Sequence, residues 1–188
     1  NKNSNISALA SANLKTIAMR FPKHKVARSI LKRINFPLAM PSANMSSNIS
    51  PVNARDVYEE FKKKIKFIID GGQSIIGIES TVVDLTNKPK ILRPGIISSS
   101  KIEKILNLKV KKNKNDQKIK SPGMLKKHYS PGIPVLINQK KPDKISAYIY
   151  LGNKYKNKLK KFSLSKKSDL DEAASNLYKT FRLIKKQG

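Results

Sequence analysis

The stretch that most constrains the fold is PSANMSSNISP, from Pro41 to Pro51, in which most side chains are hydroxyls or amides. Such a run cannot pack into an apolar core, because each buried hydroxyl or amide would need its own hydrogen-bond partner. An apolar run, Phe36 to Met40, precedes it, and a helix is expected to start near Asn53. A polar loop between a strand and a helix is where open α/β sheets hold ligands. On composition alone this run favours a solvated turn of serines and asparagines, and a binding loop is the alternative that the next stretch strengthens.

A second stretch, GIESTVVDLTNKPKILRPG from Gly77 to Gly95, has the pattern of a hairpin. Its first strand is interrupted by three polar side chains, Glu79-Ser80-Thr81, and its second strand ends on the charge of Arg93 before Pro94 and Gly95. Polar and charged groups at strand ends are more typical of a site than of a core.

Apolar periodicity along the rest of the chain alternates between strand and helix, which predicts an α/β protein with a twisted, open mixed sheet. The expected strands are Thr16–Arg20, Phe36–Met40, Ile65–Asp70, Ile75–Leu85, Lys90–Arg93, Val135–Ile137 and Ala147–Leu151. The expected helices follow Pro22 (face Val26, Ile30, Ile34), Asn53 (Val57, Phe61, Ile65), Ser100 with Glu103, and Ser168 with Asp171 (Ala173, Leu177, Phe181, Ile184).

Three regions follow from this pattern. Residues 1–106 carry most of the expected elements, and residues 107–132 form a linker that begins with the lysine- and asparagine-rich run Asn107 to Lys120. The linker continues with SPGMLKKHYSP, whose Met124, His128 and Tyr129 a pure spacer does not need. Residues 133–188 contain an incomplete, smaller α/β domain.

Composition limits the class of protein. The 188 residues include no cysteine, which excludes disulfides and cysteine metal sites and fits a reducing, cytoplasmic location. No apolar run reaches the ~20 residues that a membrane-spanning helix needs, so no membrane partner is expected. The formal net charge of +28 favours contact with RNA or acidic surfaces, but the lysines are spread over every segment rather than along one stripe.

The order of four motifs, PSANMSSNISP, ESTVVD, LRPG and SPGMLKKHYSP, resembles that of threonylcarbamoyl-AMP synthases in their long form. In that form a YrdC-like domain is joined by a linker to a small second domain, here expected to be partly Rossmann-like. The segment TIAMRFPKHKVARSIL, Thr16 to Leu31, also resembles the family. The resemblance implies synthesis of L-threonylcarbamoyl-adenylate from L-threonine, bicarbonate and ATP, with Mg2+ expected and pyrophosphate as the other product. The intermediate would serve tRNA threonylcarbamoyladenosine modification, completed by a separate transferase complex.

The resemblance also assigns residues. ATP would be bound by Thr16, Ser42, Asn44, Ser50, Arg93 and Tyr129, and L-threonine by Arg20, the backbone at Met40, and Ser80. An arginine suits both anions because its planar fork matches phosphate and carboxylate. Tyr129 resembles the linker tyrosine that closes the site over the nucleotide. His24 and His128 are too few and too far apart to predict a metal site, and no catalytic residue is assigned.

Two departures from the family leave alternatives open. The family's threonine-rich strand and K-x-R motif do not occur here, and the second domain stops before its expected last strand, so the sequence is expected to be a fragment with little or no synthase activity alone. One alternative is a YrdC-like module that binds double-stranded RNA without catalysis, which a steep salt dependence of RNA binding would reveal. Another is a related carbamoyl-adenylate enzyme for metal-centre maturation, which the HYSP linker argues against.

Overall fold

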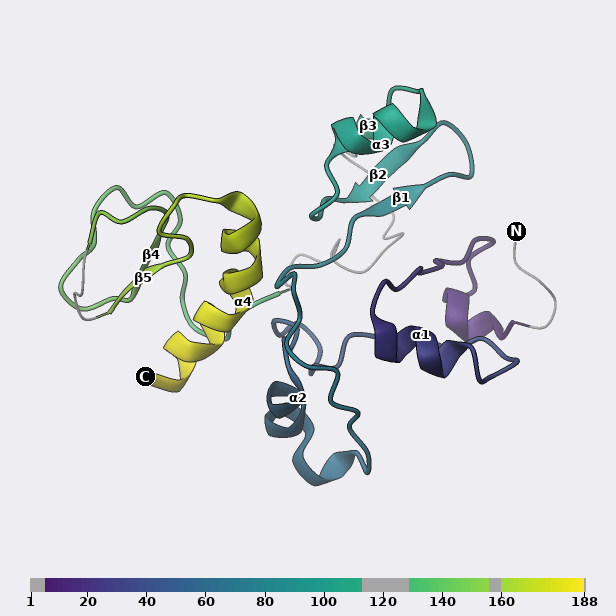
Figure 1. The fold of residues 1–188 in the computed structure, drawn as a ribbon, viewed down its shortest axis with the longest axis horizontal. Helices are drawn as coiled ribbons and strands as arrows, with labels where there is room; N and C mark the ends of the chain where they lie inside the picture. Colours follow the sequence, from purple (N-terminus) through teal and green to yellow (C-terminus); the bar gives the residue numbers. More distant parts are fainter. Residues whose placement is uncertain (1–5, 113–128, 156–159, 188) are drawn as a thin grey trace. The chain divides into compact units, whose positions relative to one another are not determined.

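The computed structural model describes residues 6–112, 129–155 and 160–187. The chain divides into two compact units, Asn1–Ser42 and Ala43–Gly188, and each is described by itself. The elements appear in chain order in Figure 1. None of the helices in the described ranges is long and apolar enough to cross a membrane.

The first unit contains a short 3-10 helix, η1 (Ala8–Ser11), and helix α1 (Lys25–Leu31). The helix expected after Pro22 is therefore confirmed, and it begins at a cap formed by His24, whose Nδ1 accepts the N–H of Ala27 at 3.5 Å. Thr16–Arg20 and Phe36–Met40 were expected to be strands, but neither forms one. A strand requires a neighbour with which to exchange backbone hydrogen bonds, and within the described residues no strand pairing involves these segments.

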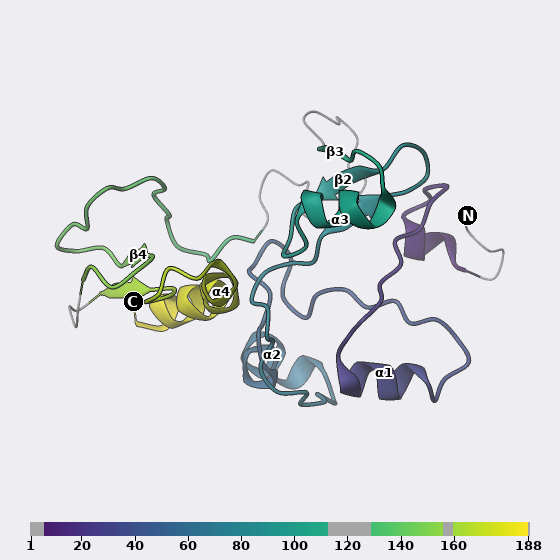
Figure 2. The same ribbon diagram turned by 45° about the horizontal axis from the view of Figure 1, so that its top comes forward.

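The second unit holds a small mixed sheet, ordered β1 (Val82–Asp84), β2 (Lys90–Arg93) and β3 (Lys111–Lys112). Strands β1 and β2 are antiparallel and β2 and β3 are parallel, so the expectation of a mixed α/β sheet is confirmed. Helix α3 (Ser99–Leu106) lies beside this sheet in both ribbon views (Figures 1 and 2). The expected strand Ile75–Leu85 is paired only at Val82–Asp84, and Ile65–Asp70 does not form a strand.

Helix α2 (Ala54–Phe61), followed by η2 (Lys62–Lys64), starts as expected at Asn53, whose Oδ1 accepts the N–H of Asp56 at 2.8 Å. Its fully buried side chain is Asp56, whereas the predicted apolar residues Val57 and Phe61 are only half-buried. The expected face was wrong in this respect because a cation from a distant helix, described below, faces Asp56.

Two other caps differ from the expected ones. Helix α3 begins two residues earlier than predicted, since Ser98, not Ser100, accepts the N–H of Lys101. The carboxylate of Glu103 instead accepts the N–H of Val110 at 2.8 Å beyond the helix end.

The C-terminal part of the second unit contains two parallel strands, β4 (Tyr148–Tyr150) and β5 (Lys161–Ser163), and the long helix α4 (Leu170–Gln187). Strand β4 confirms the core of the expected strand Ala147–Leu151, whereas Val135–Ile137 does not form a strand and β5 was not predicted. Asp169, rather than Ser168, caps α4 by accepting the N–H of Glu172 at 2.6 Å.

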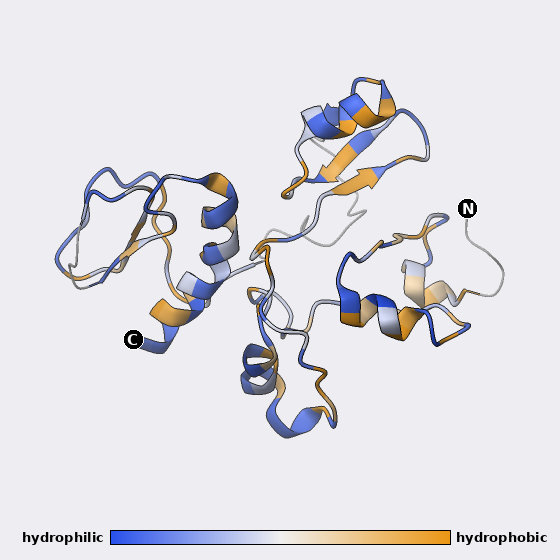
Figure 3. Ribbon diagram, viewed as in Figure 1, coloured by the Kyte–Doolittle hydropathy of each residue, from blue (hydrophilic) through white to orange (hydrophobic). Residues whose placement is uncertain are grey.

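In Figure 3, orange hydrophobic residues mark much of β1 and β2, whereas α4 shows both blue hydrophilic and orange hydrophobic residues along its length. One apolar cluster joins Ile49, Val52 and Tyr178, with Tyr129, Leu177 and Phe181 packed around it. The cluster therefore brings together the polar loop, the residue Val52 ahead of α2, the linker residue Tyr129 and helix α4.

Candidate functional site

Arg93, the last residue of β2, is only 8% exposed, and its guanidinium lies against three other groups. Its Nε donates to the carbonyl oxygen of Ser80 at 2.9 Å and its Nη2 to the hydroxyl of Ser80 at 3.1 Å. Its Nη1 donates to the hydroxyl of Tyr129 at 2.9 Å and lies 3.8 Å from Oε2 of Glu79. This pattern of donors fixes the plane of the fork at the edge of the sheet.

The turn after Arg93 lets the two strand ends approach closely. A Cβ built on Gly95 would overlap the backbone nitrogen of Thr81 and the carbonyl oxygen of Glu79. The glycine of the LRPG motif is therefore required because the backbone of residues 79–81 occupies the space of a side chain. This close approach holds Ser80 within reach of Arg93.

The polar loop reaches the same edge through Ser50. The hydroxyl of Ser50 donates to Oε1 of Glu79 and lies 3.4 Å from Oδ1 of Asn44. Glu79 thus connects Ser50 with Arg93, so that an uninterrupted set of polar contacts runs from the loop to the end of β2.

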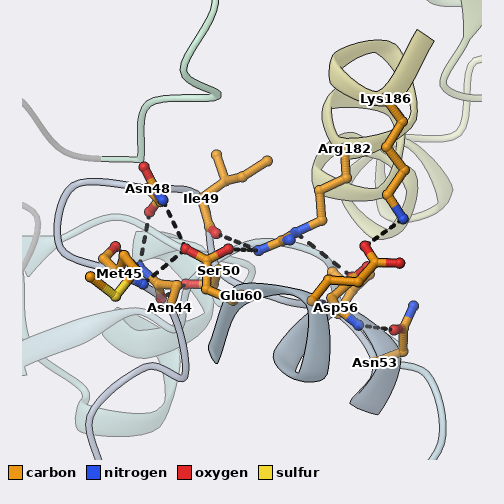
Figure 4. A network of polar contacts seen from close by, with 12 residues as sticks. Asn44, Met45, Asn48, Ile49, Ser50, Asn53, Asp56, Glu60, Arg182 and Lys186 are labelled. Carbon is orange, nitrogen blue, oxygen red and sulfur yellow. Dashed lines mark hydrogen bonds and ion pairs between the residues drawn. The ribbon is translucent and has the colours of Figure 1, made fainter. Parts of the chain in front are cut away.

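Glu60 of α2 holds the loop in shape from below (Figure 4). Its Oε1 accepts the N–H of Met45 at 2.9 Å and the amide of Asn48 at 2.8 Å, while the amide of Asn44 donates to the carbonyl of Asn48 at 3.1 Å. Burial opposes the ionisation of Glu60, but these hydrogen bonds and the charge of Arg182 outweigh it, so the pKa of Glu60 lies below its usual value.

Arg182 of α4 meets the loop and α2 at one point (Figure 4). Its Nη2 donates to the carbonyl of Ile49 at 2.9 Å and lies 3.6 Å from Oε2 of Glu60, and its Nε lies 3.7 Å from Oδ2 of Asp56. One turn further on, Lys186 pairs with Glu59 at 2.6 Å. Two acidic residues of α2 therefore face one buried cation from the C-terminal helix.

Tyr129 closes the arrangement from the end of the linker. The residue after it, Ser130, pairs with the loop: its N–H donates to the carbonyl of Ser47 at 2.8 Å, and its carbonyl accepts the N–H of Ile49 at 3.2 Å. The ring of Tyr129 stacks on that of Tyr178 with 6.4 Å between centroids. Burial, with a smaller contribution from the charge of Glu79, raises the pKa of the Tyr178 hydroxyl well above its ordinary value.

The structure brings together five of the candidate site residues, all in the second unit: Asn44, Ser50, Ser80, Arg93 and Tyr129. The other four, Thr16, Arg20, Met40 and Ser42, belong to the first unit and have exposed side chains there. Met124 and His128 of the linker motif lie outside the described residues.

Four site residues were not assigned from the sequence: Glu60, Glu79, Tyr178 and Arg182. Among these, only Glu79 carries a sequence signal, the polar interruption of an apolar segment. Glu60, Tyr178 and Arg182 sit within regular helical patterns, where their side chains look like ordinary surface or core positions.

The ligand that these side chains suit best is an anion whose oxygens lie in a plane, as in a carboxylate, or form a tetrahedron, as in a phosphate. A buried arginine with fixed donors, flanked by serine hydroxyls and an asparagine amide, offers N–H and O–H donors at the edge of a sheet. In the ranges that the structure describes, no three histidine or acidic residues cluster as a metal site would require. Fold and site together define an α/β protein with a cluster of polar and charged side chains at one edge of its sheet.

Comparison with known proteins identifies the family. Residues 1–95 match the Sua5/YciO/YrdC family profile, described as "Telomere recombination", and residues 97–187 match the profile of the threonylcarbamoyl-AMP synthase C-terminal domain. Curated relatives named threonylcarbamoyl-AMP synthase include those of Pyrococcus abyssi, 36% identical over 95% of this chain and 58% of the relative, and Bacillus subtilis, 38% identical over 77% and 43%. The crystal structure of P. abyssi Sua5 complexed with L-threonine matches with a TM-score of 0.85 and 31% identity, covering 99% of this chain and 60% of that one.

The chain belongs to the Sua5/YciO/YrdC family, in the long form that carries the Sua5 C-terminal domain. It spans about three fifths of the length of the P. abyssi relative, at 58%.

Proposed function

We propose that the protein is an L-threonylcarbamoyladenylate synthase, which converts L-threonine, bicarbonate and ATP into threonylcarbamoyl-AMP and pyrophosphate. The observation that carries the proposal is the contact of Arg93 with both Ser80 and Tyr129, since this contact joins a residue proposed for threonine to two proposed for ATP. The relatives named threonylcarbamoyl-AMP synthase, and the match to a Sua5 structure complexed with L-threonine, support it.

The chemistry needs a meeting point for two anions. The amine of threonine and bicarbonate condense to a carbamate with release of water, a carbamate oxygen attacks the α-phosphorus of ATP, and the bond to pyrophosphate breaks. Charge builds up on phosphate oxygens as this bond breaks, so fixed donors lower the barrier. Arg93 is already held by the protein in one orientation, and this orientation would cost nothing to reorganise during the reaction.

The remaining residues of the loop would bind the nucleotide. Asn44 and Ser50 face each other across 3.4 Å on the loop. The family motifs assign further ATP contacts to Thr16 and Ser42. The threonine carboxylate would be gripped by Arg20, with Ser80 and the backbone at Met40 as further contacts. Each assignment is carried by its position in the family motifs.

Tyr129 would exclude water from the product. The mixed anhydride of threonylcarbamoyl-AMP hydrolyses in water, so the site must close during turnover. The segment at Tyr129 and Ser130 pairs with the loop at Ser47 and Ile49, and this docking would place the ring beside the nucleotide. The hydroxyl of Tyr129 also accepts a hydrogen bond from Arg93, so closure of the site by Tyr129 and phosphate binding by Arg93 would be coupled.

Mg2+ would enter as the partner of ATP. The ion prefers phosphate oxygens, water and one or two carboxylates. At the part of the site that the structure describes, Glu79 is already engaged by Ser50 and Arg93. Glu60 is engaged by Met45, Asn48 and Arg182. These residues do not make a site for the ion.

Further partners and boundaries belong to the same proposal. The product would pass to a separate transferase complex for tRNA modification in the cytoplasm, and the +28 net charge favours contact with tRNA or double-stranded RNA. We also propose a YrdC-like region at residues 1–106, a linker at 107–132 and the small C-terminal domain at 133–188.

The proposal is tested by incubating the full-length protein with ATP, bicarbonate and L-threonine and separating the products by chromatography. Threonine-dependent release of pyrophosphate together with a threonylcarbamoyl-adenylate peak is expected. Replacing L-threonine with L-valine, which keeps the shape but lacks the hydroxyl, is the matched control. Equal pyrophosphate release with and without amino acid would contradict the proposal.

A further inference from the structure

We propose that helix α4 of the C-terminal domain is a working part of the nucleotide site, with Tyr178 and Arg182 as positioning residues. The inference rests on the proposed function, because it assigns these two residues a role in ATP binding. It goes beyond the residue assignments made from the family motifs, none of which falls in α4.

Tyr178 supports the residue that closes the site. Its side chain is 8% exposed, and its ring stacks on Tyr129 with an interplanar angle of 30°. Tyr129 in turn bonds Arg93 at 2.9 Å. Tyr129 also has a left-handed backbone, with φ of 55°, which is unfavourable for a side chain of this size. The packed ring of Tyr178 helps to hold Tyr129 in that conformation, together with the hydrogen bond to Arg93 and the pairing of Ser130 with the loop.

Arg182 supports the polar loop. Its Nη2 donates to the carbonyl of Ile49, the residue before Ser50, and the same side chain is drawn toward α2 by Asp56 and Glu60 (Figure 4). Glu60 also accepts from Met45 and Asn48 of the loop. The cation from α4 thus helps to fix the loop both directly and through Glu60.

A third contact brings the backbone of α4 to the segment before β1 that carries Glu79 and Ser80. A Cβ on Gly77 would overlap the carbonyl oxygen of Ser175 and lie 2.9 Å from that of Ala174. The helix therefore touches all three segments that make the site: the loop, residues 77–80 and the docked Tyr129. A helix that merely tethered a second domain would need only one of these contacts.

The test is a double-mutant cycle on ATP affinity, measured by calorimetry on the full-length protein. Tyr178→Ala should weaken ATP binding by roughly three- to tenfold, the loss expected for one buried aromatic pair. Because Tyr178 acts through Tyr129, Tyr178→Ala should change the affinity by less than about twofold when Tyr129 is already alanine. Tyr178→Phe keeps the stacked ring and should bind ATP like the wild type.

Two further variants serve as a replacement and as a control for the double-mutant cycle. Tyr178→Leu retains apolar volume without the ring, so it replaces Tyr178→Ala if that variant does not fold. Lys186→Gln removes the outer α2–α4 ion pair, which does not touch the loop, and should leave ATP affinity unchanged. The same loss from Tyr178→Ala in both backgrounds, or no loss in either, would overturn the inference. Normal ATP binding without threonine-dependent pyrophosphate release would instead count against the proposed function alone.

Discussion

At the scale of single residues, Arg93 concentrates the contacts at the sheet edge, because its planar guanidinium is held by several groups at once. Ser80 and Tyr129 accept hydrogen bonds from it, and Glu79 offsets part of its charge. An arginine held this rigidly loses little side-chain entropy when an anion binds, which is why its replacement should be felt in affinity before anything else.

Arg93→Ala should weaken ATP binding by about 1.5–3 kcal/mol, the value of a hydrogen bond to a charged group, as measured by calorimetry. The change also leaves Glu79, at 18% side-chain exposure, without this cation. The matched control is therefore Arg93→Ala with Glu79→Gln, which removes the stranded charge. If ATP affinity is unchanged in Arg93→Ala, the residue does not contact the nucleotide.

Arg20→Lys should raise the KM for L-threonine while the affinity for ATP hardly changes. Lysine keeps the charge but cannot bind a carboxylate through two parallel hydrogen bonds. The control is Arg28→Lys, the same change at an exposed position of α1 in the same unit. A parallel loss for both substrates would mean that Arg20 supports the structure of the first unit rather than the amino acid.

At the scale of elements, the packing of α2 against α4 is electrostatic where the sequence pattern suggests an apolar contact. Asp56 and Glu60 lie one turn apart on α2, and both face Arg182. Buried pairs of this kind stabilise little relative to apolar groups, but breaking one is costly because a charge is left without a partner. The apolar cluster of Ile49, Val52 and Tyr178 lies beside this pair and supplies the burial that the charges do not.

Arg182→Ala should destabilise the protein by about 3–5 kcal/mol in urea denaturation, because Asp56 and Glu60 lose their buried cation. Lys186→Gln, at the exposed end of the same interface, should cost less than about 1 kcal/mol. Comparable losses from the two variants would show that Arg182 is not the central contact between the helices.

At the scale of the whole molecule, the second unit is held together by contacts between residues far apart in the chain. The bond from Arg182 to Ile49 spans 133 positions, and that from Arg93 to Tyr129 spans 36. The carboxylates that take part must be ionised, so the stability of this unit should depend on pH.

Glu60 gives that dependence a direction. Its pKa is lower in the folded protein than the ordinary value of 4.5, so the unfolded chain binds more protons at acidic pH. The stabilising contribution is fully present above that ordinary value and is lost as pH falls through the lower, folded value. Urea denaturation at a series of pH values should show the loss, and Glu60→Gln should reduce its slope there. Glu59→Gln, at a more exposed ion pair, is the control and should change the slope less. If the pH dependence of the free energy of unfolding is the same in Glu60→Gln as in the wild type, Glu60 does not contribute to the acid sensitivity of this unit.

What the sequence by itself determined is local. The cap at Asn53, the strand Lys90–Arg93, the core of β4 and the presence of α1, α3 and α4 follow from residues within a few positions of one another, because caps and periodicity act over single turns and strands. The motif order identified the loop, the hairpin and Tyr129, and the structure joins Asn44, Ser50, Ser80, Arg93 and Tyr129 into one set of contacts.

Only the tertiary structure decided which charges meet. Glu79 contacts Ser50 and Arg93, which lie far from each other in the sequence. Asp56 and Glu60 contact Arg182 because the chain folds α4 back onto a loop more than a hundred residues earlier. The same folding made Asp56 the buried residue of α2 and left several apolar segments extended without strand partners. Periodicity reports which face of an element is apolar, but the partner that covers the face is a property of distant residues, and this is why the role of α4 could not be found from the sequence.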